Sequence, residues 1–305
     1  MIKVFGHKSP DTDSTGSPIA WAWYLSEVKG TPAEAVLLGE PNTEAAFVLK
    51  HWELAKPAII TDIAAGDEVV IVDTNNPAEL VPSINEAKLL AIIDHHMLVG
   101  GLKTKTPIDI TIRPLACTAT IMHDLMGADV ARAPRGVKGA MLSCILSDTL
   151  EFRSPTTTAH DRAVAESLAA DLGVSIPELA AKMFEAKSDV SAFSDAELLR
   201  MDSKEYNVAG KELRVSVLET TAPKVVLDRK DSLMSSMIEV AKEDGADQVL
   251  LFVVDIIREE ATLLVPNDLV KQLAEASFGC KVSGDTVVLP GIMSRKKQII
   301  PSLKL

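Results

Sequence analysis

Short, continuous apolar runs alternate with helical patterns along the first two-thirds of the chain. The runs are four or five residues long and lie at residues 2–5, 35–38, 69–72 and 89–93. Because their apolar positions are continuous rather than alternating, we expect strands that are covered on both faces. Strands that alternate with helices are typical of βαβ units. The pattern predicts an α/β fold, a mostly parallel sheet with helices on both faces.

Apolar residues at helical spacing predict six helices in the same region. They are expected at residues 18–28, 43–54, 119–126, 137–147, 159–171 and 177–186. Gly30 suits the end of the first helix, and Thr43 or Asn42 can cap the start of the second.

The pattern changes near residue 187, and a chain of 305 residues exceeds what one hydrophobic core usually organises. Small polar residues at 188–195 predict a linker between an N-terminal domain, 1–187, and a C-terminal domain, 196–305. In the C-terminal domain we expect strands at 204–208, 213–218, 248–257 and 261–265, a turn at 209–211 and a helix at 232–243. This second domain is predicted to be smaller and of mixed α+β type, with the active site in the interdomain cleft.

Composition narrows the class of protein. Apolar residues make up 47% and charged residues 24% of the chain, which is typical of a globular protein and argues against disorder. The net charge of -12 argues against a general nucleic-acid binder, because such proteins gather basic residues to hold phosphates. A small anionic substrate is compatible with this charge if positive residues gather locally.

Cysteine usage and apolar run lengths predict a cytoplasmic location. Cys117, Cys144 and Cys280 are an odd number at wide spacing, which favours reduced thiols over a disulfide frame. The N-terminal residues show no signal-peptide pattern, and no stretch approaches the roughly 18 apolar residues needed to cross a bilayer. We therefore expect no membrane partner.

Side chains that bind metal ions follow three of the predicted strands. They are His7, Asp11 and Asp13 after the first strand, Asp73 after the third, and Asp94, His95 and His96 after the fourth. The carboxyl ends of parallel strands face one crevice, so these residues should converge. Asp and His without Cys suit Mn²⁺, Mg²⁺, Co²⁺ or Fe²⁺. Several carboxylates at one point repel each other, which makes a site with two divalent ions the more sensible prediction.

Single members of this set also have purely structural interpretations. Asp11 or Asp13 could cap the following helix, and an Asp such as Asp73 is common after a strand. Asp148 closes an apolar helix, so by itself it is interpreted as a helix-end residue. The other histidines, His51, His123 and His160, lie in helical contexts and are interpreted as surface or core residues.

The C-terminal tail is locally basic in an acidic chain. Its last twelve residues contain Arg295, Lys296, Lys297 and Lys304 and no acidic residue. Basic tails are often simply solvated. This one follows a turn at Pro290-Gly291 and precedes apolar residues 299–300, which indicates that it is packed in place. An ordered Arg-Lys pair is suited to holding phosphate oxygens.

Taken together, these motifs resemble one enzyme family. Residues 6–13, 73–75, 94–96, 147–148 and 294–298 resemble, in content, order and spacing, the family II (manganese-dependent) inorganic pyrophosphatases of the DHH phosphoesterase superfamily. The Asp94-His95-His96 motif is shared by the whole superfamily, whereas its combination with the segment 294–298 is highly specific. Only 51 residues separate His96 from Asp148, so the nucleotide-sensing insert of some family members is absent.

The resemblance implies a role for each site residue. It implies that His7 and Asp11 hold one metal ion, that Asp13, His95 and Asp148 hold the other, and that Asp73 bridges both. His96 would face the substrate, Asp94 would orient its neighbours, and Lys204, Arg295 and Lys296 would bind substrate phosphate. The implied cofactors are two Mn²⁺ per subunit, with Co²⁺ or Mg²⁺ as substitutes and a further Mg²⁺ with the substrate. A homodimer through the first domain is also implied.

The expected reaction is hydrolysis of inorganic pyrophosphate to two phosphates. Two metal ions that share a water lower its pKa from ~15.7 towards neutrality and so produce the attacking hydroxide. Asp73, His96, Arg295 and Lys296 are the expected catalytic groups, and closure of the two domains would assemble the site. Two alternatives stay open: a DHH phosphoesterase acting on short oligonucleotides or phosphoadenosine phosphate, and a non-catalytic protein that binds metal or phosphate.

Overall fold

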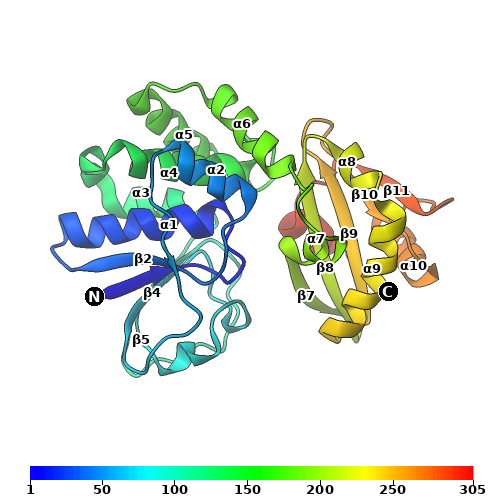
Figure 1. Cartoon of the computed structure of the whole chain (residues 1–305), viewed down its shortest axis with the longest axis horizontal. Coiled ribbons are helices and arrows are strands. Elements are labelled where there is room, and N and C mark those ends of the chain that lie inside the picture. Colours follow the sequence, from blue (N-terminus) through cyan, green and yellow to red (C-terminus); the bar gives the residue numbers. More distant parts are fainter. Residues whose placement is uncertain (305) are drawn as a thin grey trace. The chain divides into compact units, whose positions relative to one another are not determined.

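The computed structural model describes residues 1–304, and the chain forms two compact units, Met1–Ala186 and Lys187–Leu305 (Figure 1). Each unit has its own sheet and its own core. Within residues 1–304, every helix is too short or too polar to cross a membrane.

The first unit is built on a six-stranded sheet in which every neighbouring pair is parallel. Its strands are β1 (Ile2–Phe5), β2 (Ala33–Leu37), β3 (Ala58–Ile59), β4 (Glu68–Val72), β5 (Lys88–Asp94) and β6 (Asp109–Ile112), in the order β3-β2-β1-β4-β5-β6. The predicted parallel sheet is confirmed. Strand order reverses between β1 and β4, and ligands of open α/β sheets bind beyond the carboxyl ends of the strands at such a point.

Helices cover one face of this sheet and short helical turns cover the other. The helices are α1 (Thr12–Trp23), α2 (Thr43–His51), α3 (Thr118–Met126), α4 (Arg135–Thr149), α5 (Ala159–Leu172) and α6 (Ile176–Ser188); a π-helical turn, Tyr24–Val28, extends α1, and a 3₁₀ segment, Gly127–Arg132, follows α3. Figure 1 shows α1, α3 and α4 on the same side of the strands. Val70 and Val72 of β4 join the core on this side. Val69 and Ile71 pack on the other side with Leu80, Val81 and Ile84, which lie between or within the 3₁₀ turns Pro77–Glu79 and Pro82–Glu86.

The first helix begins earlier than the sequence pattern predicts. We expected a start at Pro18, but α1 begins at Thr12 and Pro18 lies inside it. Asp11 caps the helix, and its side chain accepts a hydrogen bond from the Ser14 amide at 2.8 Å. The first turns contain Thr, Ser and Gly, which are weak helix formers, yet they are buried, so tertiary packing outweighs local propensity here.

The second unit carries a five-stranded mixed sheet in the order β11-β10-β9-β8-β7. Its elements are α7 (Asp195–Met201), β7 (Ser203–Val208), β8 (Lys211–Thr220), α8 (Pro223–Leu227), α9 (Lys230–Asp244), β9 (Gln248–Asp255), β10 (Glu260–Leu264), α10 (Asp268–Phe278), β11 (Thr286–Pro290), a π-helical turn, Arg295–Ile299, and α11 (Ile300–Ser302). Only β8 and β9 pair in parallel; the other pairs are antiparallel. The predicted mixed α+β character is confirmed.

Local sequence explains the hairpin of the second unit. Ala209 and Gly210 both have positive φ, 50° and 81°, which is the geometry of a tight two-residue hairpin turn. In the predicted linker, 188–195, α6 continues to Ser188 and α7 begins at Asp195. The sequence pattern did not predict α10, although Asn267 caps it and its apolar residues Val270 and Leu273 are buried.

Candidate metal centre

The loop after β1 brings His7 to the carboxyl edge of the parallel sheet. The His7 amide donates a hydrogen bond to the Ser14 hydroxyl at 2.7 Å, which ties the loop to the first turn of α1. A Cβ on Gly6 would lie 1.9 Å from that same hydroxyl oxygen, so only glycine allows this approach. His7 Nε2 lies 3.6 Å from a carboxylate oxygen of Asp11, the capping residue.

Asp73 lies at the end of β4 between two histidines. Its Oδ2 is 3.6 Å from His7 Nε2, and its Oδ1 is 3.3 Å from His95 Nε2. Asp73 is buried and adopts a left-handed backbone with φ of 58°, which is costly for a residue other than glycine. Such strain gathers at functional sites, and here it is held by the hydrogen bond from the Asp73 amide to the Ile93 carbonyl at 2.9 Å.

The end of β5 organises two adjacent histidines around the carboxylate of Asp94. Asp94 Oδ1 lies 2.9 Å from His96 Nδ1 and accepts the His95 amide at 2.7 Å, while Oδ2 accepts the Asn75 side-chain amide at 2.5 Å. Burial favours the neutral acid, but the contacts with His96 outweigh it and hold the pKa of Asp94 well below its usual range. His95 Nδ1 lies 3.3 Å from the Leu115 carbonyl, so its Nε2 is directed at Asp73.

A second acidic group forms between α1 and α4. Ligand atoms of Asp13, Asp148 and Cys117 lie within 4.8 Å of one another. Asp13 is fixed by the Ser17 hydroxyl at 2.5 Å and by the Thr118 amide at 2.7 Å. Burial and the neighbouring carboxylates raise the pKa of the Cys117 thiol, so at neutral pH it is an uncharged neighbour of the two acids.

Buried oxygen atoms of two carboxylates at this centre indicate that the donor set suits cations. Burial raises the pKa of Asp73 and of Asp148 well above the usual range, and the charges of Asp13 and Asp11 raise them further. The Oδ2 atoms of Asp73 and Asp148 are buried without a hydrogen-bond partner. Buried charges are costly unless they are paired or bind a metal ion. Carboxylates and imidazoles in this arrangement therefore fit divalent cations.

The six predicted ligands all lie in this region of the first unit. The close groups are His7 with Asp11 and Asp73, Asp73 with His95 and His96, and Asp13 with Cys117 and Asp148. Asp73 belongs to two of these groups, and its charge also acts on Asp148. The structure thus brings the predicted ligands together with His96, whose individual roles remain predictions.

In the second unit, the ends of the segment 294–298 lock its basic middle in place. The Ser294 hydroxyl accepts the Lys297 amide, and the Gln298 side-chain oxygen accepts the amides of Met293 and Ser294, each at 2.9 Å. Ile299 is fully buried. Ser294 and Gln298 therefore hold the π-helical turn that carries Arg295, Lys296 and Lys297.

Arg295 is anchored beside the strand that carries Lys204. Its guanidinium forms an ion pair with the Asp202 carboxylate at 2.7 Å and donates to the Asp202 carbonyl at 2.9 Å. Burial opposes the charge, but Asp202 outweighs burial and raises the pKa of Arg295. Lys204 lies on β7, two residues after Asp202. The structure therefore places the region of Lys204 next to the segment of Arg295 and Lys296.

Comparisons with known proteins agree with this geometry. The model of the DHH family N-terminal domain matches residues 1–147, and the model of the DHHA2 domain matches residues 181–305. A Deinococcus radiodurans protein named a probable manganese-dependent inorganic pyrophosphatase is 39% identical, and the alignment covers 100% of this chain and 98% of that protein. The manganese-dependent inorganic pyrophosphatase of Methanocaldococcus jannaschii is 36% identical, with the same coverage.

Solved structures agree as well. A crystal structure of a Methanococcus jannaschii protein assigned to the family II inorganic pyrophosphatases matches with a TM-score of 0.86 and 34% identity, covering 99% of this chain and 98% of that one. The chain belongs to the manganese-dependent inorganic pyrophosphatases. The resemblance inferred from the motifs is confirmed.

Sequence reasoning missed several residues that support the centre of this pyrophosphatase-family chain. Cys117 and Thr118 lie in a segment without an acidic or histidine cluster, so no motif pointed to them. Thr118 donates through its amide to Asp13 and through its hydroxyl to Asp73, the latter at 3.3 Å. The buried Asp161 accepts the Ala116 amide at 3.1 Å and so fixes the same segment.

The remaining histidines lie on helices. His51 is at the end of α2, His123 is half-buried on α3 with its pKa lowered by burial, and His160 on α5 lies 2.8 Å from Asp124.

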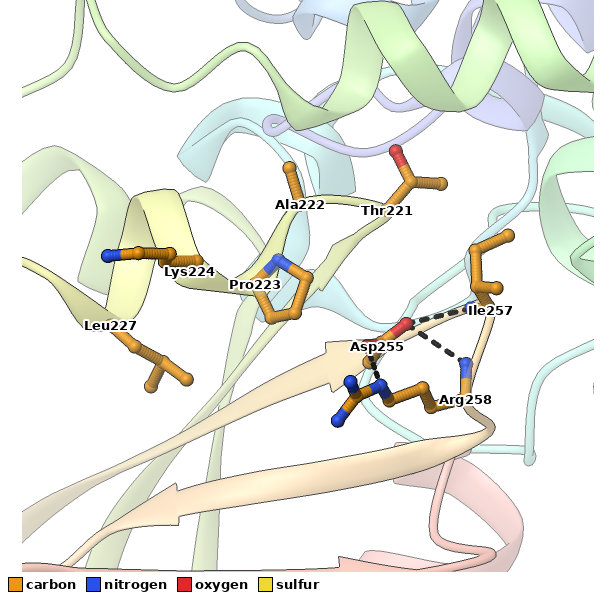
Figure 2. Close-up of a pocket in the computed structure, with 8 residues that line it drawn as sticks. All are labelled: Thr221, Ala222, Pro223, Lys224, Leu227, Asp255, Ile257 and Arg258. Atoms are coloured by element: carbon orange, nitrogen blue, oxygen red, sulfur yellow. Dashed lines mark hydrogen bonds and ion pairs between the residues drawn. The ribbon is translucent and has the colours of Figure 1, made fainter.

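A separate pocket of about 570 Å³ opens in the second unit at the carboxyl ends of the parallel strands β8 and β9 (Figure 2). Asp255 accepts the backbone amides of Ile257 and Arg258 at 2.9 and 3.0 Å. Lys224 pairs with Asp228 at 2.6 Å. The charged residues that line the pocket thus have partners close by, and no unpaired buried group among the described residues of its lining indicates a ligand. Within the described chain, its lining is distinct from the cations of the family motif.

Proposed function

We infer that this chain hydrolyses inorganic pyrophosphate to two phosphates with divalent metal ions held by its first unit. Membership of the manganese-dependent inorganic pyrophosphatases supports the reaction. The structural observation that carries the inference is that the buried Oδ2 atoms of Asp73 and Asp148 have no hydrogen-bond partner in the described part of the chain. Neither carboxylate can be ionised there at low cost without a cation.

We propose the following division of ligands. His7 and Asp11 hold one ion, Asp13, His95 and Asp148 hold the other, and Asp73 serves both. The position of Asp73, with one oxygen towards His7 and one towards His95, supports the shared role. Such a pair of ions, when bound, acidifies water and withdraws charge from phosphoryl oxygens.

The chain's own residues would then bind and orient the substrate. His96, whose ring is fixed by Asp94, would donate to a phosphate oxygen, and this contact is supported by its position beside Asp73. Arg295, Lys296 and Lys204 would neutralise phosphate charge as the P–O–P bond breaks. Arg295 is oriented by Asp202, which leaves part of its fork of donors for phosphate.

We propose Mn²⁺ as the resident metal, with two ions per subunit. The Asp and His donors also accept Co²⁺ or Mg²⁺ as substitutes, because affinity in such sites depends on supply as well as on ligand type. A further Mg²⁺ would arrive with pyrophosphate, because this ion binds phosphate oxygens and is usually held by the substrate together with few protein ligands.

We also propose a cytoplasmic homodimer that forms through the first unit. The outer strand β6 leaves one edge of the parallel sheet open, and Ile110 on this strand is 55% exposed. An open edge with apolar residues is suited to pairing with a second chain. Light scattering on the purified protein would show two chains per particle under this proposal.

The deciding experiment compares substrates. The protein with Mn²⁺ is given pyrophosphate, a dinucleotide or phosphoadenosine phosphate, and released phosphate is measured. We expect turnover of pyrophosphate to exceed the others by orders of magnitude. Preferential cleavage of a nucleotide would make the chain a different DHH phosphoesterase, and tight Mn²⁺ binding without any turnover would make it a non-catalytic binding protein.

A further inference from the structure

A fully buried glutamate lies beside the metal centre but outside its groups of ligand atoms. Glu44 is the second residue of α2 and has no exposed surface. Its sequence context, Asn42-Thr43-Glu44, has no nearby histidine or acidic cluster, so the motif pattern did not single it out. Buried glutamates are rare in proteins unless their charge is compensated.

One oxygen of Glu44 joins two segments that carry predicted ligands. Its Oε2 accepts the Thr12 hydroxyl at 2.8 Å and the Ser147 hydroxyl at 2.6 Å. Thr12 begins α1 and lies between Asp11 and Asp13. Ser147 lies in the last turn of α4 and directly precedes Asp148. Hydrogen bonds to a carboxylate are stronger than those between neutral groups, and more so in a dry site.

We propose that Glu44 is a positioning residue that sets the separation between the ligands on α1 and the ligand on α4. This proposal rests on the metal centre of the proposed function. The tie acts next to Asp148, which follows Ser147 and whose Oδ2 has no hydrogen-bond partner of its own among residues 1–304. Loss of a residue that holds metal ligands in position typically weakens metal binding by about 10- to 100-fold.

A second hydrogen bond between α2 and α4 provides a control for a purely structural role, in which Glu44 only holds these two helices together. One turn before Ser147, the Ser143 hydroxyl accepts a hydrogen bond from the Trp52 indole at 3.0 Å, and both residues are buried. This bond joins the C-terminal end of α2 to α4, but neither of its two residues adjoins a predicted metal ligand in sequence, whereas Thr12 and Ser147 do. Ser143→Ala and Ser147→Ala therefore remove the same atom from the same helix, four positions apart.

The test is a calorimetric titration of the metal-stripped protein with Mn²⁺, combined with urea unfolding of each variant. We expect Ser147→Ala and Glu44→Leu to weaken Mn²⁺ binding by about 10- to 100-fold, while Ser143→Ala binds as the wild type does. Glu44→Gln keeps an acceptor oxygen and should bind Mn²⁺ nearly as tightly as the wild type. Should Glu44→Leu fail to fold, the comparison of the two serine variants still decides.

Three results would overturn the proposal: wild-type Mn²⁺ affinity in Ser147→Ala, an equal loss of affinity in Ser143→Ala, or a loss in Glu44→Gln as large as that in Ser147→Ala. Reduced stability without a change in affinity would mean that Glu44 only supports the fold. Failure of the wild-type protein to bind Mn²⁺ would instead refute the proposed function itself, so the two failures are distinguishable.

Discussion

Asp73 Oδ1 lies 3.3 Å from His95 Nε2; the Asp73 side chain is almost completely buried, and that of His95 is 10% exposed. This short approach joins the ends of β4 and β5, and the other oxygen of Asp73 faces His7 from β1. Three neighbouring strands of one parallel sheet therefore meet at a single carboxylate.

Asp73→Asn should abolish metal-dependent hydrolysis of pyrophosphate. The amide keeps the size of the side chain but cannot supply the charge that a shared ligand contributes. Mn²⁺ affinity, measured by calorimetry, should fall by more than the roughly 100-fold that marks loss of a supporting residue. Asp67→Asn is the control, because Asp67 pairs with Lys3 at the opposite end of the sheet. Near-normal turnover in Asp73→Asn would contradict a shared ligand.

Without metal, the protein should lose stability as pH rises above about 4, because Asp148 must then either stay protonated or carry an uncompensated charge. Asp148 has a raised pKa in the folded state, so above the ordinary pKa of Asp, about 4, the folded state binds more protons than the unfolded state. Its contribution is therefore present at low pH and lost as pH rises. Asp148→Asn removes this contribution.

Urea unfolding from pH 4 to 8 checks this prediction. The stability of Asp148→Asn relative to wild type should increase with pH in the absence of metal. Excess Mn²⁺ should reverse the order, because ionised Asp148 then gains a partner. A difference that does not change with pH would show that the carboxyl is not forced to stay protonated.

Arg295→Lys should raise KM for pyrophosphate about tenfold or more with a smaller effect on kcat. Lysine keeps the charge but loses the planar fork that contacts Asp202 and that, in our proposal, also holds phosphate. Loss of one charged hydrogen bond costs about 1.5–3 kcal/mol, and each 1.4 kcal/mol is a factor of about ten. Arg258→Lys changes an exposed arginine of the same unit and should leave KM unaltered. Equal KM values for wild type and Arg295→Lys would remove Arg295 from substrate binding.

Asp161→Ala should lower both stability and Mn²⁺ affinity. Asp161 accepts hydrogen bonds from the Ala116 amide and from the amide and hydroxyl of Thr158, and Ala116 directly precedes the segment that supports Asp13 and Asp73. We expect a loss of about 2–4 kcal/mol in the free energy of unfolding. Unfolding by urea and titration with Mn²⁺ measure the two effects.

The capping box of α7 is a control for Asp161. Glu197 fills the same position in the cap of α7 but is exposed. Glu197→Gln should cost less than about 1 kcal/mol and leave Mn²⁺ affinity unchanged. A loss of stability in Asp161→Ala at unaltered Mn²⁺ affinity would limit Asp161 to capping α5.

The sequence predicted the strand ends of the site well because strand periodicity and ligand chemistry coincide there. Continuous apolar runs that end in Asp73 or in Asp94-His95-His96 fix both the direction of the strand and the edge at which the side chains lie. In a parallel sheet this is enough to bring them together. The terminal basic segment was recognisable because its Ser294 and Gln298 are themselves the residues that hold the turn.

The rest of the site depends on packing that no local pattern records. The sequence pattern predicts the start of α1 six positions too late, because Thr, Ser and Gly are weak helix formers and their burial in the first turns cannot be read from local sequence. The sequence alone indicates only a helix-end residue at Asp148. The burial of its carboxylate depends on how α4 packs against α1. Glu44 reaches Thr12 and Ser147 from positions 32 and 103 residues away in sequence, a distance over which periodicity carries no information.

The central claim is that divalent ions at this centre are required for pyrophosphate hydrolysis. The most direct measurement strips the protein of metal with a chelator, adds back Mn²⁺, Co²⁺, Mg²⁺ or Zn²⁺ separately, and records phosphate release from pyrophosphate. The account predicts no turnover in the stripped protein, full recovery with Mn²⁺, and partial recovery with Co²⁺ or Mg²⁺. Undiminished turnover after complete stripping, or no recovery with any of these ions in a folded protein, would contradict it.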